Sequence, residues 1–245
     1  MDLTNLPLVS TLLDLTSTGL MALTSLLTPA TGPLAAALAI VLVTLVVRTG
    51  LIPAGIAQAK ADQVRARLAP RLRELQKRHR GDPERLRRET MQLYRSEGAS
   101  PLAGCLPILV QAPIVGLLYS VFLHTSLAGH PNALLSQTLF GVPLGASLAG
   151  AVGSGAADPA TWIVIGCLVL MIATVGELAR RMFRLPPMQT AGSPRLSAGL
   201  LGVLQFATAI VAMFVPLAAG LYLLTTVAWT LGQRLILRRV YPPAT

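Results

Sequence analysis

The stretch that decides the fold runs from Leu34 to Ile56 and reads LAAALAIVLVTLVVRTGLIPAGI. It is apolar for about 20 residues, which is the length that crosses the hydrocarbon of a bilayer as an α-helix. Arg48 interrupts it eight residues before the apolar run ends. At helical rise the charge lies roughly 12 Å from the polar boundary, farther than an arginine side chain comfortably reaches. We therefore expect a membrane span that carries one buried charge.

Arg48 is the first candidate functional residue. A guanidinium cannot lose its proton, so inside a membrane it needs water, polar side chains or a bound anion around it. This favours a wet cavity within the bilayer. The alternative is a side chain that snorkels toward the surface with local thinning of the bilayer, because insertion scales assign arginine a cost of only ~2.5–3.5 kcal/mol.

The composition indicates an integral membrane protein. The 245 residues are 53% hydrophobic and only 12% charged, whereas about a quarter of the residues of a soluble domain are charged. Segments rich in Lys and Arg stay on the cytoplasmic side of a membrane, so their positions predict an external N-terminus and a cytoplasmic C-terminus. The twenty basic residues fall into blocks: Arg48 alone, twelve between Lys60 and Arg95, four between Arg180 and Arg195, and three between Arg234 and Arg239.

Together, the apolar runs and the charge blocks predict an all-α membrane protein with five spans. An odd number of spans does not fit the two equal inverted halves of many secondary transporters. The predicted segments are an external interfacial amphipathic helix (1–33), the first span (34–56), a basic cytoplasmic helical hairpin (57–100), the second span (101–123), an external loop (124–157), the third span (158–178), a cytoplasmic loop (179–195), the fourth and fifth spans (196–215 and 217–237) and a cytoplasmic tail (238–245).

The hairpin contains twelve basic and six acidic residues. Gly81 is expected to end its first helix, Asp82 to cap the second and Pro83 to occupy the first helical position. Its charge has three interpretations: a topology signal that also attracts anionic lipid, contact with ribosomal RNA or an acidic partner, and sequence-specific nucleic-acid binding, for which no motif is present. The candidate functional residues of the hairpin are Arg71, Arg73, Lys77, Arg78, Gly81, Asp82 and Pro83.

The two cysteines, Cys105 and Cys167, each lie in an apolar run. They are expected to be small buried side chains and not a disulfide or metal ligands. Neither a Cys/His cluster with ligand spacing nor a nucleotide-binding motif nor a catalytic constellation is visible in the sequence. We expect no cofactor and no metal, and we do not expect an enzyme.

Three stretches carry a more specific signal. TLVVRTGLIP covers Thr44–Pro53, PLAAGLYLLTTVAWTLGQ covers Pro216–Gln233, and Leu68–Phe122 between them contains GDPE, PLAGCLP and QAPI. In these stretches and in their spacing the chain resembles the YidC membrane protein insertases, bacterial relatives of the mitochondrial Oxa and plastid Albino proteins. It departs from residues common in that family at Ser100, Ala218, Leu223 and Val227.

The resemblance implies five spans around a positively charged hydrophilic groove, open to cytoplasm and lipid and closed outside. It also implies a function, the insertion and folding of new membrane proteins in the bacterial cytoplasmic membrane. The implied partners are nascent membrane proteins and the lipid bilayer, with the ribosome and the Sec translocon as further candidates. Gln111 and Trp229 match the family by position, whereas Gln205 is chosen by depth alone. The candidate groove residues are Arg48, Gln111, Gln205, Tyr222, Thr226 and Trp229.

Other interpretations stay open at this point. The Gln and Thr side chains could instead form hydrogen bonds between helices without touching a substrate. Arg48 could bind an anion or a lipid headgroup in a small carrier or scramblase, or pair with a carboxylate of a partner subunit in a larger complex. A carrier needs a cavity that also opens outward, whereas the basic hairpin and Gln111 favour insertion.

Overall fold

The structure, a computed structural model, describes residues 7–79, 81–98, 106–127, 130–155, 158–182 and 207–240. In these ranges the chain is mostly helical, as the fold class predicts. The described helices are α1 (Pro7–Thr31), η2 (Gly32–Leu34), α2 (Ala35–Gly50), α3 (Ile52–Arg78), α4 (Pro83–Ser96), α5 (Leu106–Leu123), α6 (Ala133–Ser136), α7 (Leu148–Gly153), α8 (Pro159–Met182), α10 (Ala207–Phe214) and α11 (Leu217–Val240).

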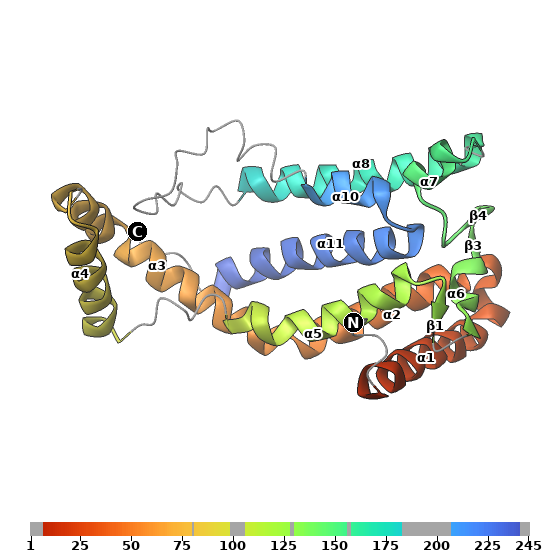
Figure 1. Cartoon of the computed structure of the whole chain (residues 1–245), viewed down its shortest axis with the longest axis horizontal. Helices are drawn as coiled ribbons and strands as arrows, with labels where there is room; N and C mark the ends of the chain where they lie inside the picture. The colour runs from red at the N-terminus through yellow and green to blue at the C-terminus, as the bar shows by residue number, and fades with distance from the viewer. Residues whose placement is uncertain are drawn as a thin grey trace.

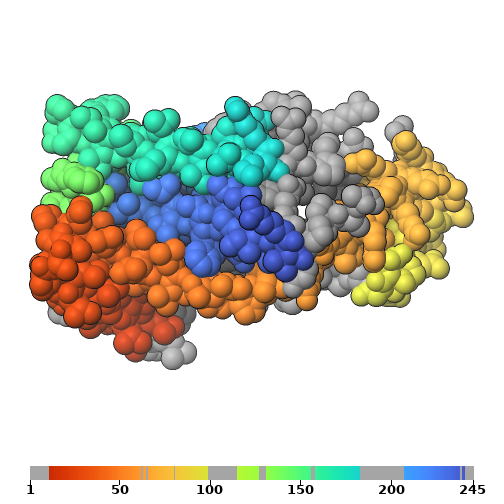
Figure 2. Space-filling model, turned by 180° about the vertical axis from the view of Figure 1, so that it is seen from behind, coloured from red at the N-terminus to blue at the C-terminus, as the bar shows by residue number. Residues whose placement is uncertain are grey.

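The long helices run along one axis of the molecule (Figure 1). Helix α11 lies between α8 on one side and α2 with α5 on the other, and it contacts all three. Helix α1 folds back along α2 through the short turn η2, while α3 leaves the bundle at its far end, where α4 crosses it. From behind, α11 is seen in a band between α8 and the α2–α3 pair (Figure 2).

Two described helical stretches are long and apolar enough to cross a membrane, Thr11–Gly50 and Pro159–Met182. The first contains both α1 and α2, and the second is α8. Large apolar side chains are exposed along α8, which suits contact with lipid better than contact with water. These findings agree with a helical membrane protein, and the count of five spans stays a prediction. The exposed side chains of α8 include Trp162, Ile163, Leu170 and Met171.

The prediction that Cys167 is buried is wrong, because its side chain is exposed on α8. Successive residues of a helix point about 100° apart, so only one stripe of α8 can face the bundle. Ile165 and Leu168 occupy that stripe and are buried, which turns Cys167 outward. Cys105 lies outside the described residues.

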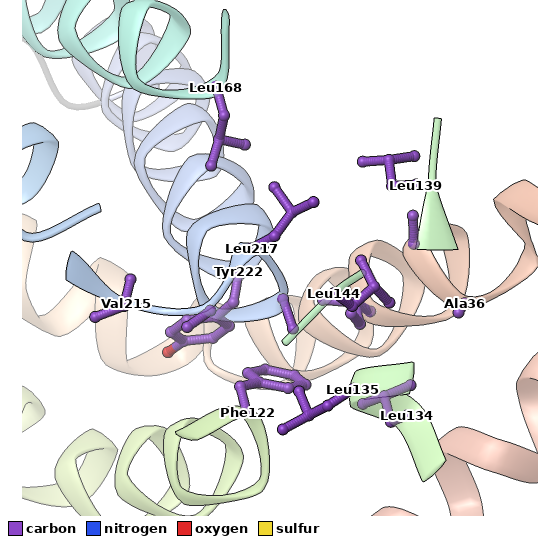
Figure 3. Close-up of a cluster of buried hydrophobic side chains, with 14 of the residues drawn as sticks. Ala36, Phe122, Leu134, Leu135, Leu139, Leu144, Leu168, Val215, Leu217 and Tyr222 are labelled. Atoms are coloured by element: carbon purple, nitrogen blue, oxygen red, sulfur yellow. The ribbon is translucent and has the colours of Figure 1, made fainter. Parts of the chain in front are cut away.

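The main apolar core lies at the end of the bundle opposite the hairpin (Figure 1). Phe122 of α5 and Tyr222 of α11 face each other there, with ring centroids 6.0 Å apart (Figure 3). Leu134, Leu144 and Leu217 are fully buried in the same cluster. Relative to exposure to water, burial of such a leucine is worth roughly 1.5–3 kcal/mol. This core closes one end of the bundle.

Short strands connect the helices at this closed end. The turn between β3 and β4 holds Phe140 and Gly141 at φ 51° and 84°, the positive values that two-residue hairpin turns require. The two antiparallel ladders are β1 (Ser126–Leu127) with β2 (His130–Pro131), paired Ser126 to Pro131 and Leu127 to His130, and β3 (Thr138–Leu139) with β4 (Val142–Pro143), paired Thr138 to Pro143 and Leu139 to Val142.

Hydrogen bonds fasten this connecting segment to the long helices. The buried Asn132 side chain donates to two backbone carbonyls at the end of α5, at 2.7 and 3.0 Å. The amides of Leu217 and Ala218, which begin α11, donate to the carbonyls of Ala146 and Leu144 at 2.8 and 2.9 Å. Because the first amides of a helix have no partner within it, these bonds satisfy groups that burial would otherwise strand. The polar site described next lies toward the opposite end.

Candidate substrate-binding site

A small pocket of about 50 Å³ lies where α2, α3 and α11 meet. Four of its seven lining residues are polar or charged, in helices that are otherwise largely apolar around it. In the described ranges no group of His, Cys, Asp and Glu side chains is arranged to hold a metal ion. The pocket is lined by Arg48, Leu51, Ala54, Gly55, Gln58, Thr230 and Gln233.

Arg48 reaches this pocket because it lies in the last turn of α2. The helix breaks at Leu51, which has φ −89° and ψ 3°. Two residues later Pro53 has no N–H to donate back to Thr49, but it fits the first turn of α3 well. A cation in the last turn of a helix is stabilised by the helix dipole. The predicted span 34–56 therefore runs across a helix break, and it stays a prediction as a span.

Gly55 brings α3 and α11 close together. The side-chain amide of Gln233 lies directly over the Gly55 Cα, so that a Cβ atom at this position would overlap the Gln233 Nε2 and Cδ atoms. Glycine is the residue that permits such a close approach. The contact forms one wall of the pocket and sets the position of the Gln233 amide beside Gln58 and Arg48.

Tyr222 connects Arg48 to the apolar core. The guanidinium of Arg48 lies close enough to the Tyr222 hydroxyl to donate a hydrogen bond to it. Tyr222 is only 3% exposed and does not line the pocket described above. Its ring faces Phe122 (Figure 3). Tyr222 therefore lies beside Arg48 on the side of the closed core, while Arg48 also lines the pocket.

Within the part of the chain that the structure describes, three buried polar atoms of α11 have no hydrogen-bond partner: Thr226 Oγ1, Trp229 Nε1 and Gln233 Nε2. Leaving a buried donor unpaired costs about 1–3 kcal/mol, so buried groups of this kind are uncommon and call for an explanation. Neighbouring threonines of the same helix behave differently, since the Thr225 and Thr230 hydroxyls each donate to the carbonyl four residues earlier at 2.8 Å. The unpaired donors are thus a feature of one face of α11.

The hairpin of α3 and α4 is built as predicted at its turn. Asp82 caps α4 by accepting a hydrogen bond from the Arg85 amide at 2.9 Å, and Pro83 is the first helical residue. Helix α3 ends at Arg78, earlier than the predicted stop at Gly81. The His79 amide makes the last helical bond, to the Leu75 carbonyl, and the Asp82 amide then bonds back to the His79 carbonyl in a turn. The predicted basic residues Arg71, Arg73, Lys77 and Arg78 all lie on the exposed part of α3.

Glu97, at the end of α4, joins the two hairpin helices. Its carboxylate accepts from Arg67 at 3.1 Å and from Arg71 at 2.8 Å, both on α3. Among the described residues of the hairpin, the buried side chains are Leu68, Leu86 and Tyr94. Because so little apolar surface is buried, these ion pairs and the short apolar seam hold the hairpin together.

A second polar contact lies near the hairpin turn. Glu89 of α4 lies 2.9 Å from the His79 ring nitrogen Nε2 and accepts from Arg85 at 3.1 Å. The Arg85 hydrogen bond and the charge of His79 hold the pKa of Glu89 below its ordinary value of 4.5. The ionised carboxylate is therefore the form that the closed hairpin favours.

The model of the family described as 60Kd inner membrane protein matches residues 26–244. The chain belongs to this family. The match covers the pocket, the hairpin and the closed end of the bundle, and it confirms the resemblance found in the sequence. Membership places the chain among inner membrane proteins.

Curated relatives in the family share the name membrane protein insertase YidC. The chain is 30% identical to the one from Streptomyces avermitilis over 221 residues, which covers 84% of this chain and 51% of the relative. It is 41% identical to the one from Oceanobacillus iheyensis over 92 residues, or 36% of each chain. For the relative from Helicobacter pylori, 83 residues align at 41% identity, 34% of this chain and 15% of the relative. The chain thus spans about half or less of the length of these relatives.

Within this family member, the structure brings together only part of the predicted groove. Arg48 lines the pocket, Tyr222 contacts Arg48, and Thr226 and Trp229 share the face of α11 that leads to the pocket. Gln111 lies in α5, and its side chain is outside the described residues, as is all of Gln205. Their place in a groove therefore stays a prediction.

Three polar residues of the pocket are absent from the predicted set, namely Gln58, Thr230 and Gln233. The last two could have been found from helical spacing, because they continue the row of polar residues along α11. Gln58 gives a weaker signal. It lies ten residues after Arg48 and beyond the helix break, so only the path of α3 shows that the two line one pocket.

Proposed function

We propose that this protein inserts newly made membrane proteins into the bacterial cytoplasmic membrane and helps them fold. The observation that carries the proposal is the pocket where Arg48, Gln58, Thr230 and Gln233 meet inside an otherwise apolar helical bundle. Membership of the family, and the name that its relatives carry, support the same function. The protein would act as a chaperone-like insertase that hydrolyses no nucleotide.

The mechanism follows from where the charge lies. A polar site within the cytoplasmic half of the bilayer shortens the hydrocarbon path that the polar tail of a client must cross. Arg48 attracts the carboxylates of an acidic tail, and this attraction is stronger in a low-dielectric site than in water. The apolar span of the client then leaves for the lipid, driven by burial of its own apolar surface. The tail must be released as well, so its binding is weak.

The topology completes the proposal. Five spans surround a groove that is open to the cytoplasm and closed outside, the N-terminus lies outside, and the C-terminus lies in the cytoplasm. The blocks of Lys and Arg support this orientation. The closed core around Phe122 and Tyr222 then lies toward the external side, and the α3–α4 hairpin lies in the cytoplasm. There its exposed arginines are available to the nascent chain, the ribosome or the Sec translocon.

Replacement of Arg48 by alanine tests this function. A carboxylate about 8 Å from the guanidinium gains about 2 kcal/mol at an effective dielectric constant of about 20. We therefore expect Arg48→Ala to slow the insertion of a client with an acidic tail roughly tenfold or more, and that of a neutral client far less. The rates are measured in liposomes that contain the purified protein, by protection of the client tail from protease.

The control is Arg239→Ala, which removes the same charge from an exposed position at the end of α11. Equal losses for acidic and neutral tails at normal protein levels would contradict the electrostatic mechanism. Arg48→Lys separates this mechanism from a site for phosphate or lipid headgroups. Lysine keeps the charge but loses the two-pronged donor geometry, so an insertase tolerates it and a bidentate anion site does not.

A further inference from the structure

Along α11, the residues whose buried polar atoms lack a partner among the described residues form a single row. Thr226, Trp229 and Gln233 follow one another at spacings of three and four, which places them on one helix face. All three unpaired atoms, the Thr226 hydroxyl, the Trp229 indole nitrogen and the Gln233 amide nitrogen, can donate a hydrogen bond. Arg48, which lines the pocket at the end of this row, also offers only donors.

We propose that this row binds the main-chain carbonyl oxygens of an extended client segment. The inference rests on the proposed function and deepens it, because it names the chemical group of the client that the site recognises. Arg48 would then select for charge, whereas the row would hold any polypeptide tail whatever its sequence.

A site made of donors needs a ligand made of acceptors. In a helical segment the carbonyl groups are already bonded within the helix. In an extended segment that has left water they are not, and each unpaired carbonyl is costly in an apolar setting. A row of donors would therefore stabilise the tail of a client in the state in which it crosses the membrane, before or without helix formation.

The spacing of the row suits an extended chain. The three residues lie about 4.5 and 6 Å apart along the helix axis, at a rise of 1.5 Å per residue. Carbonyl groups on one side of an extended strand recur every second residue, about 6.6–6.8 Å apart. The row of about 10 Å therefore spans two successive carbonyls on one edge of the client, and the long Trp229 and Gln233 side chains can adjust to their positions.

The donors are buried in this structure, so a client must part α11 from the helices that cover the row. Unpaired donors favour this exchange, because parting the helices there breaks no hydrogen bond made by these three atoms. A client carbonyl then supplies the partner that the closed state lacks. The neighbouring Thr225 and Thr230 hydroxyls gain nothing from a client, because each already donates to its own helix.

This contrast provides a matched pair of variants, Thr226→Val and Thr225→Val. Both remove one hydroxyl from adjacent positions of the same helix and keep the shape of the side chain. Insertion is measured in liposomes for two single-span clients, one with a neutral tail and one with an acidic tail. We expect Thr226→Val to slow the insertion of both clients by the same factor, about three- to tenfold. Thr225→Val should insert both clients at the rate of the unaltered protein. The thermal midpoint of Thr226→Val should not fall, because valine removes an unpaired buried hydroxyl.

A second client tests the carbonyl itself. In a semi-synthetic neutral tail, alternate amide links are replaced by esters, whose carbonyl oxygens are weaker acceptors. For this ester-containing client, the insertion rate of the unaltered protein divided by that of Thr226→Val should fall toward one. An unchanged ratio would assign the donors to lipid oxygens or to helix packing and would overturn the inference.

Two further results would also overturn it. Equal rates for Thr226→Val and Thr225→Val would show that the free donor does not matter. A loss confined to the acidic tail would attribute the effect to the field of Arg48. If the unaltered protein inserts the clients, either of these results overturns the inference but leaves the proposed function standing. If the unaltered protein inserts neither client, the proposed function is contradicted, and this inference with it.

Discussion

Arg48 combines several features of the local chain. It lies in the last turn of α2, where the helix dipole favours a cation, and the helix breaks three residues later at Leu51. Tyr222 accepts from it on the closed side, while Gln58 and Gln233 lie with it around the pocket. A charge within an apolar bundle is tolerated because polar groups surround it.

Gly55 is the residue whose change most directly tests the packing of this site. A methyl group at Gly55 would overlap the Gln233 amide, so the side chain or the α3 backbone must move. We expect Gly55→Ala to lower the free energy of unfolding by about 1–3 kcal/mol, measured as the thermal midpoint in detergent. Gly50→Ala is the matched control, since a Cβ at Gly50 meets nothing within 4 Å.

Comparison of Gly55→Ala with Gly50→Ala separates the steric overlap at Gly55 from the effect that any Gly→Ala change has on the backbone. Adding Gln233→Ala to Gly55→Ala should recover much of the lost stability, because it removes the overlapping amide. Equal changes for Gly50→Ala and Gly55→Ala would contradict the close contact between α3 and α11.

Among the elements, the α3–α4 hairpin is held together by few contacts, and Glu97 is the acidic residue that pairs with two arginines of α3. Exposed ion pairs are worth about 0–1 kcal/mol each, but the hairpin has only a thin apolar seam to add to them. We expect Glu97→Gln to broaden the distribution of distances between spin labels placed at Lys77 and Arg88. The distances are measured by pulsed electron–electron double resonance in liposomes.

Glu74→Gln is the control for that experiment. Glu74 pairs with Arg78 within α3 at 3.7 Å, so its loss removes one acidic residue without touching the link between the helices. If both variants gave the same narrow distribution as the unaltered protein, Glu97 would not hold the hairpin closed.

Acid should loosen the hairpin through Glu89. Its pKa is lower in the closed hairpin than the ordinary 4.5, mainly because Arg85 donates to the carboxylate. The stabilisation is therefore fully present above about pH 4.5 and is lost as the pH falls through the lowered pKa. The protection factors of the α4 amides, which compare their exchange rates with those of an unstructured chain at the same pH, should fall below pH 4.5, and Glu89→Gln should remove part of this fall. Protection factors that fall equally in both proteins would contradict a role for Glu89.

The elements differ in how far the sequence predicts them. Asp82 and Pro83 predict the start of α4, because the residue preferences of a helix N-cap and first turn depend only on a few neighbouring residues. The break at Leu51 was not predicted, since a proline two residues later fits both a kinked span and the first turn of a new helix. The end of α3 lies before Gly81 for a similar reason, as a glycine marks a turn but does not fix the last helical residue.

At the scale of the whole molecule, local patterns predict an apolar, helical membrane protein but not which helix faces meet. Cys167 illustrates this, because an apolar run does not show which side of α8 faces the bundle. Gln58 and Gln233 are separated by most of the chain and meet only once α3 and α11 are placed side by side. The sequence therefore predicts the part of the candidate site formed by Arg48 and α11, but it does not predict the part formed by α3.

At this scale the central claim is that a client tail enters the pocket beside Arg48. Site-specific photo-crosslinking during synthesis of a single-span client with an acidic tail tests this claim most directly. The crosslinker is placed at Thr230, which lines the pocket, or at Ala228, an exposed position on the opposite side of the same helix turn. We predict client adducts at Thr230 that fade in Arg48→Ala, and mainly lipid adducts at Ala228. Lipid adducts without client at both positions would contradict the account.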